Sequence, residues 1–310
     1  MAREQFGVCA EPNLHSYYLL FNVLDGKNDY LRKALSQLPD MVEQYSHQFS
    51  ESNLNTVIAI GATYWDDFYP QARPKNLRPF RPMASDDRIA VATHFDLFIE
   101  IRSDRADVNH IVSTKVCELL SEAVELVEQV KGFRFLDGRD LTGFVLGSDN
   151  PKGMHKRTVA LVKEHDDPIF ASGSYVHMQR YKHNLSLWQS LSTKQQEDIY
   201  GRSKRDNIEY KPEDKAETSH SARTNLTDQD EQPVEILCQS MPYGHMKTQG
   251  LFFLSYCQSP DNFELILQSM IVGDEHGHTD HLLKYTQAET GAAFFAPSLD
   301  FLAHLAERSQ

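Results

Sequence analysis

The sequence of 310 residues contains only four cysteines, and no two of them form a Cys-x-x-Cys pair. This spacing excludes a zinc knuckle and a dithiol redox motif. No apolar run approaches the ~20 residues of a membrane-spanning helix, and the N-terminus lacks the apolar region of a secretory signal. With 31 Lys and Arg against 44 Asp and Glu, no basic run is present to bind nucleic acid or acidic lipid. These absences predict a cytoplasmic protein with free thiols and no nucleic-acid or membrane partner.

Five segments in the first half of the chain have the periodicity of regular secondary structure. They are predicted strands at residues 16–23, 56–60 and 95–101 and predicted helices at residues 29–49 and 108–130. Pro39 is expected to interrupt the first helix, because proline removes a helical hydrogen bond. The apolar and acidic alternation within the third strand predicts one face exposed to solvent.

The second half repeats a similar order of elements. Its predicted strands are residues 173–181 and 251–256, and its predicted helices are residues 192–200 and 260–271. Between them, residues 201–233 form a long polar segment, and such segments within a domain are usually disordered or functional. Two β-α-β-β-α-like halves, residues 1–155 and 156–310, therefore predict an α+β fold of tandem ferredoxin-like units.

Three segments contain candidate functional residues. Residues 133–151 are rich in glycine and turn-forming pairs, and form either a linker between the halves or a loop packed against a ligand. His220, within residues 218–223, is either a solvated loop histidine or the single axial metal ligand of a planar cofactor. Cys238, within residues 236–244, is by default a small buried hydrophobe.

Together with residues 173–180, 201–204 and 291–298, these three segments resemble the dye-decolorizing (DyP-type) haem peroxidases. The resemblance extends from about Tyr17 to Leu305, with the motifs in order and similarly spaced. It implies a duplicated ferredoxin-like fold of the dimeric α+β-barrel type, with haem b bound in the C-terminal half. It also implies hydrogen peroxide as the oxidant and a small phenolic or dye-like compound as the reductant. A symmetric homo-oligomer is the expected assembly.

The resemblance also implies which residues contact the haem. His220, in a Ser-His-x-x-Arg context, matches the axial ligand of the haem iron. Asp280 is the expected carboxylate partner of its other ring nitrogen. Arg202 is predicted to pair with a haem propionate, the alternative being a solvated loop charge. Gly147 and Ser148 are further predicted cofactor contacts.

At two positions the sequence departs from the pattern of this family. Leu146 stands where the family has an aspartate above the iron, and Cys238 stands where it has an arginine. Those two groups move a proton and stabilise negative charge while the O–O bond breaks. A leucine cannot transfer a proton, and a neutral thiol is a weak donor. Asp140 and Asp149 are nearby carboxylates, but both lie outside the distal position.

Three interpretations of function follow from this departure. The leading one is a haem peroxidase whose activity is weakened by the loss of the distal Asp and Arg. The second is a non-catalytic haem-binding or sensor protein, with Cys238 as a thiolate ligand opposite His220. The third is a protein that has lost haem altogether. The tryptophans, Trp65 and Trp188, and the 13 tyrosines are either core residues or carriers of electrons, and the sequence does not choose among them.

Overall fold

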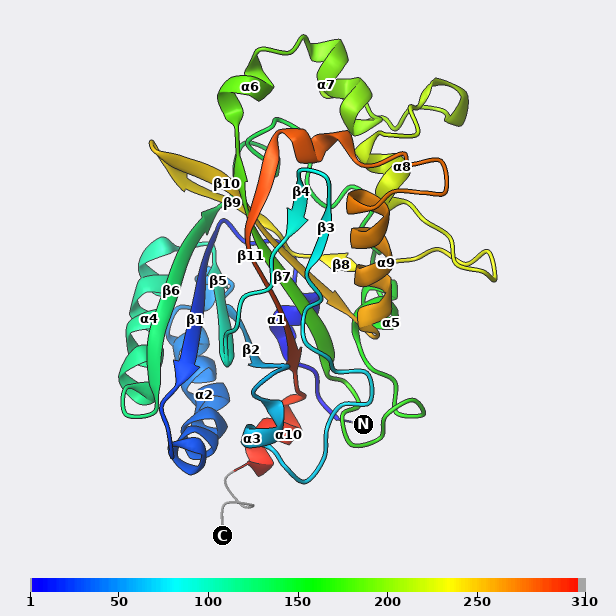
Figure 1. The fold of residues 1–310 in the computed structure, drawn as a ribbon. Coiled ribbons are helices and arrows are strands. Elements are labelled where there is room, and N and C mark those ends of the chain that lie inside the picture. The colour runs from blue at the N-terminus through cyan, green and yellow to red at the C-terminus, as the bar shows by residue number, and fades with distance from the viewer. Residues whose placement is uncertain (1, 306–310) are drawn as a thin grey trace.

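A computed structural model describes residues 2–305 of the chain (Figure 1). The first half forms four strands of one sheet, a small hairpin and two long helices. In chain order its elements are α1 (Phe6–Cys9), β1 (His15–Val23), α2 (Asn28–Gln48), η1 (Ser50–Ser52), β2 (Asn55–Gly61), α3 (Trp65–Phe68), β3 (Met83–Ser85), β4 (Arg88–Ala90), β5 (Leu97–Ser103), α4 (Ala106–Leu120) and β6 (Val124–Phe133). Apart from the β3–β4 hairpin, the long elements follow the β-α-β-β-α-β order of a ferredoxin-like unit.

The second half begins after a long connection and has more short helices. Its elements are α5 (His155–Ala160), β7 (Ser174–His183), α6 (Leu185–Gln189), α7 (Thr193–Tyr200), η2 (Pro212–Asp214), α8 (His220–Thr224), β8 (Leu237–Cys238), β9 (Met241–His245), β10 (Thr248–Cys257), α9 (Pro260–Ile271), η3 (His281–Lys284), β11 (Thr286–Ala296) and α10 (Leu299–His304). The predicted helix at residues 260–271 has the bounds of α9. The predicted boundary between the halves, residue 155, falls where α5 begins.

The strands of both halves form one antiparallel sheet that closes into a barrel. Within the first half the strand order is β2-β5-β1-β6, and within the second half it is β9-β10-β7-β11. The halves join where Gly132 of β6 pairs with Tyr243 of β9, and where β11 pairs with β2 at Phe294 and Gly61. Each half thus has the strand order of a ferredoxin-like sheet, and the predicted tandem ferredoxin-like α+β fold is confirmed.

Successive residues of each strand face two different cores, because side chains alternate across a sheet. Inside the barrel, Tyr18 stacks on Phe252 with ring centroids 3.9 Å apart. Outside it, Leu19 and Ile99 belong to the larger core, which α2 and α4 cover on one side of the barrel (Figure 1). The helix α9 packs on the far side, against β10 and β7.

The predicted interruption at Pro39 is wrong. The helix α2 is 21 residues long and continues without a break through Pro39. Its buried face extends before the proline through Leu31 and Leu35, and Met41 and Val42 continue the packing beyond it. Tertiary packing on both sides of the proline therefore compensates for the missing backbone hydrogen bond.

The predicted solvated face of residues 95–101 is also wrong, because every residue of β5 is buried. Closure of the barrel places Glu100 in its interior, where the carboxylate accepts a hydrogen bond from Tyr256 at 2.7 Å and lies 3.2 Å from Nε of Arg102. An alternating pattern is the same for a strand facing water and for one facing a buried ion pair. The sequence pattern alone cannot distinguish the two.

The predicted helix at residues 108–130 is wrong in its second part. The helix α4 ends at Leu120, and β6 runs from Val124 to Phe133 alongside β1. Val124, Val127 and Val130 are β-branched and favour an extended strand. Pairing along the whole of β1 supplies the backbone hydrogen bonds that continuation of the helix would otherwise have made.

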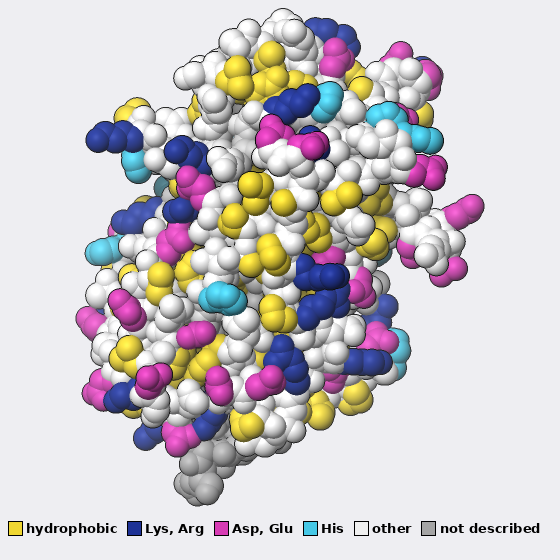
Figure 2. Space-filling view, in the orientation of Figure 1, with side chains coloured by type: hydrophobic (Ala, Val, Ile, Leu, Met, Phe, Trp, Pro, Cys, Tyr) yellow, Lys and Arg dark blue, Asp and Glu magenta, His cyan; other side chains and the backbone are white. Residues whose placement is uncertain are grey.

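The surface is mixed in charge. Figure 2 shows Lys and Arg interspersed with Asp and Glu over one face of the molecule. Within residues 2–305, no helix has the length and apolar character needed to cross a bilayer.

Candidate functional site

A cavity of about 930 Å³ lies between the barrel and the segments that surround α8, and residues of both halves line it. Its wall comprises the loop of residues 134–150, α8, β8, the start of β9, part of β10 and one face of α9. Six of the predicted site residues line it: Leu146, Gly147, Ser148, Arg202, His220 and Cys238. The fold therefore brings together residues that are far apart in the sequence.

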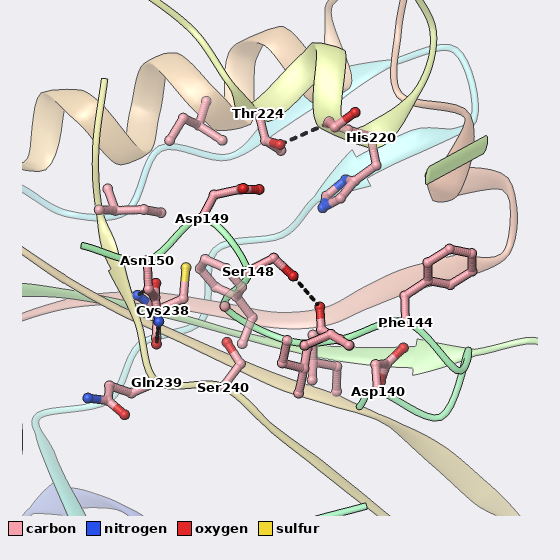
Figure 3. Close-up of a pocket in the computed structure, with 18 of the residues that line it drawn as sticks. Asp140, Phe144, Ser148, Asp149, Asn150, His220, Thr224, Cys238, Gln239 and Ser240 are labelled. Carbon is pink, nitrogen blue, oxygen red and sulfur yellow. Dashed lines mark hydrogen bonds between the residues drawn. The ribbon is translucent and has the colours of Figure 1, made fainter. Parts of the chain in front are cut away.

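The short helix α8 positions His220 at its first residue. The side chain of Ser219 caps this helix by accepting the backbone N–H of Ala222. One turn later, Arg223 donates to Asp274 at 3.0 Å and fixes α8 to the loop that follows α9. Figure 3 shows the imidazole of His220 directed into the cavity, and 30% of the side chain is exposed there.

The contact predicted between His220 and Asp280 is present. Nδ1 of His220 lies 2.6 Å from Oδ2 of Asp280, whose side chain is fully buried behind the cavity. The other carboxylate oxygen of Asp280 accepts the backbone N–H of Leu282 at 2.8 Å and caps η3. Because Nδ1 is held by the carboxylate, Nε2 is the ring nitrogen left for a ligand in the cavity.

Two opposing effects act on the pKa of His220. Burial disfavours the charged imidazolium and by itself would lower the pKa. Attraction to the Asp280 carboxylate, together with their hydrogen bond, outweighs burial and raises the pKa above its ordinary value. The carboxylate therefore increases the electron-donating character of the imidazole, which is the usual role of a carboxylate behind a metal-binding histidine.

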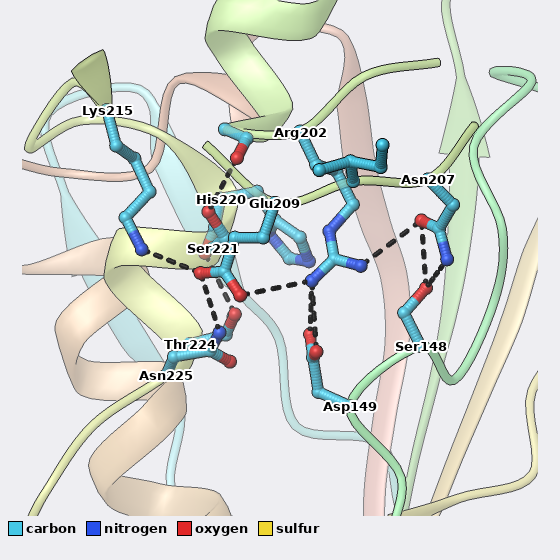
Figure 4. Close-up of polar contacts among 12 residues, drawn as sticks. Ser148, Asp149, Arg202, Asn207, Glu209, Lys215, His220, Ser221, Thr224 and Asn225 are labelled. Carbon is cyan, nitrogen blue, oxygen red and sulfur yellow. Dashed lines mark hydrogen bonds and ion pairs between the residues drawn. The ribbon is translucent and has the colours of Figure 1, made fainter. Parts of the chain in front are cut away.

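Arg202 lies on the cavity wall, but its guanidinium already has partners in the protein (Figure 4). Nη2 lies 2.9 and 3.0 Å from the two carboxylate oxygens of Asp149 and 3.5 Å from Glu209, and Nη1 donates to Asn207 at 3.1 Å. The side chain is only 8% exposed. Arg202 is thus a buried cation with partners in the protein, and the interpretation as a solvated loop charge is wrong.

Leu146 and Cys238 both line the cavity, as do their neighbours in the chain, Val145, Gly147 and Gln239. The thiol of Cys238 is half-buried, and burial raises its pKa to about 12, so that it is neutral at physiological pH. Figure 3 shows Ser240 on the same wall as Cys238, across the cavity from His220. The Ser240 hydroxyl accepts the backbone N–H of Leu254 at 3.1 Å, which leaves its own proton available.

Asn150 joins the two segments that carry Leu146 and Cys238. Its Nδ2 donates to the carbonyl of Cys238 at 2.8 Å, and its Oδ1 accepts the N–H of Cys238 at 2.9 Å. Gly147 makes this clamp possible: it has φ +62°, and a Cβ there would lie 2.6 Å from Nδ2 of Asn150. Ser148, next along the loop, donates to the carbonyl of Val145 at 3.2 Å.

The two carboxylates near the distal position are both engaged elsewhere. Asp140 accepts hydrogen bonds from Thr142 and lies 3.1 Å from Nε2 of His183. Asp149 is held by Arg202. Both carboxylates line the cavity and already have partners within the protein.

Most of the cavity lining was not singled out from the sequence, including Asn150, Tyr200 and Ser240. Ser240 carried a usable signal, because it stands two residues after Cys238 and the period of an extended chain places both side chains on one face. Asn150 and Tyr200 carried none. Their positions depend on contacts with Cys238 and His220, which are distant in the sequence.

Comparison with known proteins gives consistent matches over nearly the whole chain. The N-terminal domain of Dyp-type peroxidases matches residues 5–134, and the C-terminal domain matches residues 137–301. A dye-decolorizing peroxidase of Mycobacterium tuberculosis is 36% identical over 273 residues, which cover 87% of this chain and 81% of that protein.

Solved structures are similar as well. A putative Dyp-type peroxidase from Shewanella oneidensis has a TM-score of 0.96 and 52% identity, covering 98% of this chain and 99% of that one. A variant of DypB from Rhodococcus jostii RHA1 in complex with heme has a TM-score of 0.91 and 32% identity, covering 95% and 96%. With the fold, the cavity and the sequence in agreement, this chain belongs to the Dyp-type peroxidase family.

Proposed function

We propose that this haem peroxidase binds haem b through Nε2 of His220 and reacts slowly with hydrogen peroxide, because Leu146 and Cys238 replace the distal acid and cation. The observation that carries the proposal is the His220–Asp280 pair, at 2.6 Å, with the imidazole facing a cavity of about 930 Å³. The reductant is proposed to be a phenolic or dye-like compound, in line with the dye-decolorizing activity for which the relatives are named.

The residues present fit haem. The cavity has the size of a cofactor site, and apolar side chains that suit a porphyrin line much of its wall. Among them are Phe144, Leu251, Phe253, Leu267 and Leu283. Within residues 2–305 no hydrogen bond occupies Nε2 of His220, so this nitrogen is available to iron.

When bound, haem supplies the iron that accepts peroxide and passes the oxidising equivalents to a reductant. His220 holds the iron, and Asp280 orients the imidazole and increases its electron donation. Gly147 and Ser148 are proposed to contact the porphyrin from the loop beside it. Arg202 is proposed to share its guanidinium between a propionate and Asp149.

The distal wall is where catalysis is weakened. Cleavage of peroxide needs a group that moves a proton between the two oxygens and a charge that stabilises the departing one. Leu146 does neither. Cys238 is a neutral thiol, because burial raises its pKa to about 12. General acid–base help contributes roughly 10²–10⁴-fold, and one electrostatic donor roughly 10²–10³-fold.

The first experiment tests the haem ligand. His220→Ala is expected to abolish stoichiometric haem uptake, measured by titration of the purified protein with haem and by the Soret band. His276→Ala is the matched control, because His276 is an exposed histidine on a neighbouring loop. Uptake by His220→Ala equal to that of the wild type would contradict the assignment.

The second experiment tests the distal argument. The double variant Leu146→Asp with Cys238→Arg is expected to raise the bimolecular rate of reaction with peroxide by about 10²-fold or more. Leu146→Asn with Cys238→Met is the control, because it changes both side chains without adding a charge. Stopped-flow absorbance of the haem-loaded proteins gives the rates. Equal rates in the double variant and the wild type would mean that other groups limit the reaction.

A further inference from the structure

Tyr200 is a half-buried tyrosine that lies directly against the predicted haem ligand. It is the last residue of α7 and lines the cavity. Its ring centroid is 5.5 Å from that of His220, in an edge-to-face arrangement, and it stacks on Phe144 at 3.8 Å with an interplanar angle of 7°. Neither the binding of haem nor the cleavage of peroxide, as proposed above, uses this residue.

The hydroxyl of Tyr200 begins a hydrogen-bond chain whose direction is determined. Thr142 donates its hydroxyl proton to Oδ2 of Asp140 at 2.6 Å. Thr142 therefore has no proton left for Tyr200, and the Tyr200 hydroxyl, 3.0 Å away, must be the donor between them. The chain runs from Tyr200 through Thr142 to Asp140, which also contacts His183 at 3.1 Å.

The charges along this chain keep Asp140 in the ionised form, which is the form that can accept a proton. Burial disfavours the Asp140 carboxylate, but His183 and the hydrogen bonds from Thr142 outweigh this effect and lower its pKa, so that it is ionised. Burial and the nearby Asp140 charge raise the pKa of Tyr200 well above its ordinary value. Tyr200 thus retains its proton unless it loses an electron, after which the phenol becomes a strong acid.

A second aromatic contact leads from Tyr200 toward the surface. The rings of Tyr200 and Trp188 are 6.0 Å apart, and those of Trp188 and Tyr285 are 5.2 Å apart. Trp188 is buried, and its indole N–H donates to the carbonyl of Thr142 at 2.9 Å. Tyr285 is only partly buried. The side chains form an unbroken series of redox-active rings from the cavity to the exterior.

We propose that Tyr200 is an electron-donor residue of this peroxidase, with Thr142 and Asp140 as its proton relay and Trp188 and Tyr285 as its route to an external reductant. Tyr200 gives one electron to the peroxide-oxidised haem. As its O–H bond breaks, the proton passes to Thr142, and the hydroxyl proton of Thr142 passes to Asp140. An aromatic reductant at Tyr285 then returns one electron through Trp188, the proton moves back to Tyr200, and the reductant is oxidised.

The main measurement is electron paramagnetic resonance of the haem-loaded protein, frozen after mixing with one equivalent of hydrogen peroxide. The wild type is expected to give a tyrosyl radical, and Tyr200→Phe is expected to lose it. Tyr18→Phe is the matched control, because Tyr18 is likewise stacked on a phenylalanine but is buried outside the cavity. A radical signal in Tyr200→Phe equal to that of the wild type would overturn the proposal.

A second measurement does not depend on peroxide, and therefore separates this proposal from the proposed slow peroxide reaction on which it builds. The protein is loaded with zinc protoporphyrin, and a laser flash with a cobalt(III) quencher oxidises the porphyrin. The decay of the porphyrin cation is expected to slow about tenfold in Thr142→Val, because the phenol loses its proton acceptor. Thr142→Ser keeps a hydroxyl at this position and is expected to restore the decay rate of the wild type.

A merely structural role for the network would leave these decays unchanged. In that case Thr142→Val would lower the stability of the protein, but the decay of the porphyrin cation would be the same in Tyr200→Phe, Thr142→Val and the wild type. Equal decays would overturn the proposal even if peroxide reacts quickly with the haem-loaded protein. A slow decay in Tyr200→Phe and normal decay in Tyr18→Phe would support it even if peroxide reacts slowly.

Discussion

Nδ1 of His220 lies 2.6 Å from Oδ2 of Asp280, and this contact helps to join α8 to the segment that leads into β11. The Asp280 carboxylate is fully buried, and its second oxygen is used by the backbone N–H of Leu282. The orientation of the imidazole therefore depends on a carboxylate that is itself fixed at the start of η3.

The first prediction concerns this carboxylate. Asp280→Asn keeps the shape of the side chain but removes its charge, so the imidazole becomes a weaker electron donor. Haem affinity is expected to fall about 10–100-fold, and the reduction potential of the bound haem is expected to rise. Haem titration and spectroelectrochemistry measure the two effects.

A second His–Asp pair provides the control for that prediction. His165 and Asp166 are 3.4 Å apart, exposed and outside the cavity lining. Asp166→Asn removes a carboxylate beside a histidine and is expected to leave the reduction potential unchanged. The same potential in Asp280→Asn and the wild type would show that Asp280 does not tune the haem.

The second prediction concerns the clamp between Asn150 and Cys238. Asn150→Ala removes two hydrogen bonds at 2.8 and 2.9 Å and leaves the backbone groups of Cys238 without those partners. The free energy of unfolding is expected to fall by roughly 1–3 kcal/mol. Urea denaturation measures this free energy. Asn150→Asp retains the acceptor and loses the donor, so its stability is expected to lie between those of the wild type and Asn150→Ala. No loss of stability in Asn150→Ala would mean that water replaces the clamp.

Much of the fold and part of the site were predictable from the sequence, for identifiable reasons. The elements with clear periodicity, such as α9, were placed correctly because their pattern is local. His220, Leu146 and Cys238 were found through motifs in their immediate neighbourhood, and all three line one cavity. The contact between His220 and Asp280 was expected from the chemistry of a ligating histidine.

The remainder required information that is not local. Burial of Glu100 follows from closure of the barrel, which no single strand reveals. The end of α4 at Leu120 depends on the pairing of the next segment with β1. The engagement of Arg202 with Asp149 depends on a loop 53 residues earlier in the chain. These features are set by tertiary pairing, and a pattern within one segment does not encode them.

The third prediction concerns the pH dependence of Cys238. Burial raises the pKa of this thiol from 9.0 to about 12, so the neutral form persists at pH values where a free thiol ionises. Between about pH 7 and 10, the ferric spectrum of the haem-loaded protein is therefore expected to depend on pH in the same way in the wild type and in Cys238→Ser. A transition near pH 9 that is present in the wild type and absent from Cys238→Ser would instead support thiolate ligation of the iron and the sensor interpretation.

The fourth prediction concerns the ion pair inside the barrel. Nε of Arg102 lies 3.2 Å from Glu100, and its Nη1 donates to Gln239 at 2.7 Å, beside Cys238. Arg102→Met leaves the carboxylate of Glu100 buried without its cation. The free energy of unfolding is expected to fall by roughly 3–5 kcal/mol, because a buried charge without a partner is strongly destabilising.

Adding Glu100→Gln to Arg102→Met tests the cause of that loss. The neutral amide removes the uncompensated charge, so the double variant is expected to be more stable than Arg102→Met alone.

The pH dependence of this defect has a definite sign. Burial raises the pKa of Glu100 in the folded protein, and loss of Arg102, which lowers that pKa, raises it further. A raised carboxyl pKa costs stability as pH rises above the unfolded value of about 4.3. In urea denaturation, the loss of free energy of unfolding in Arg102→Met should therefore be larger at pH 8 than at pH 5. Adding Glu100→Gln should remove this difference. Equal losses at both pH values would show that lost packing, not the unpaired charge, is the cause.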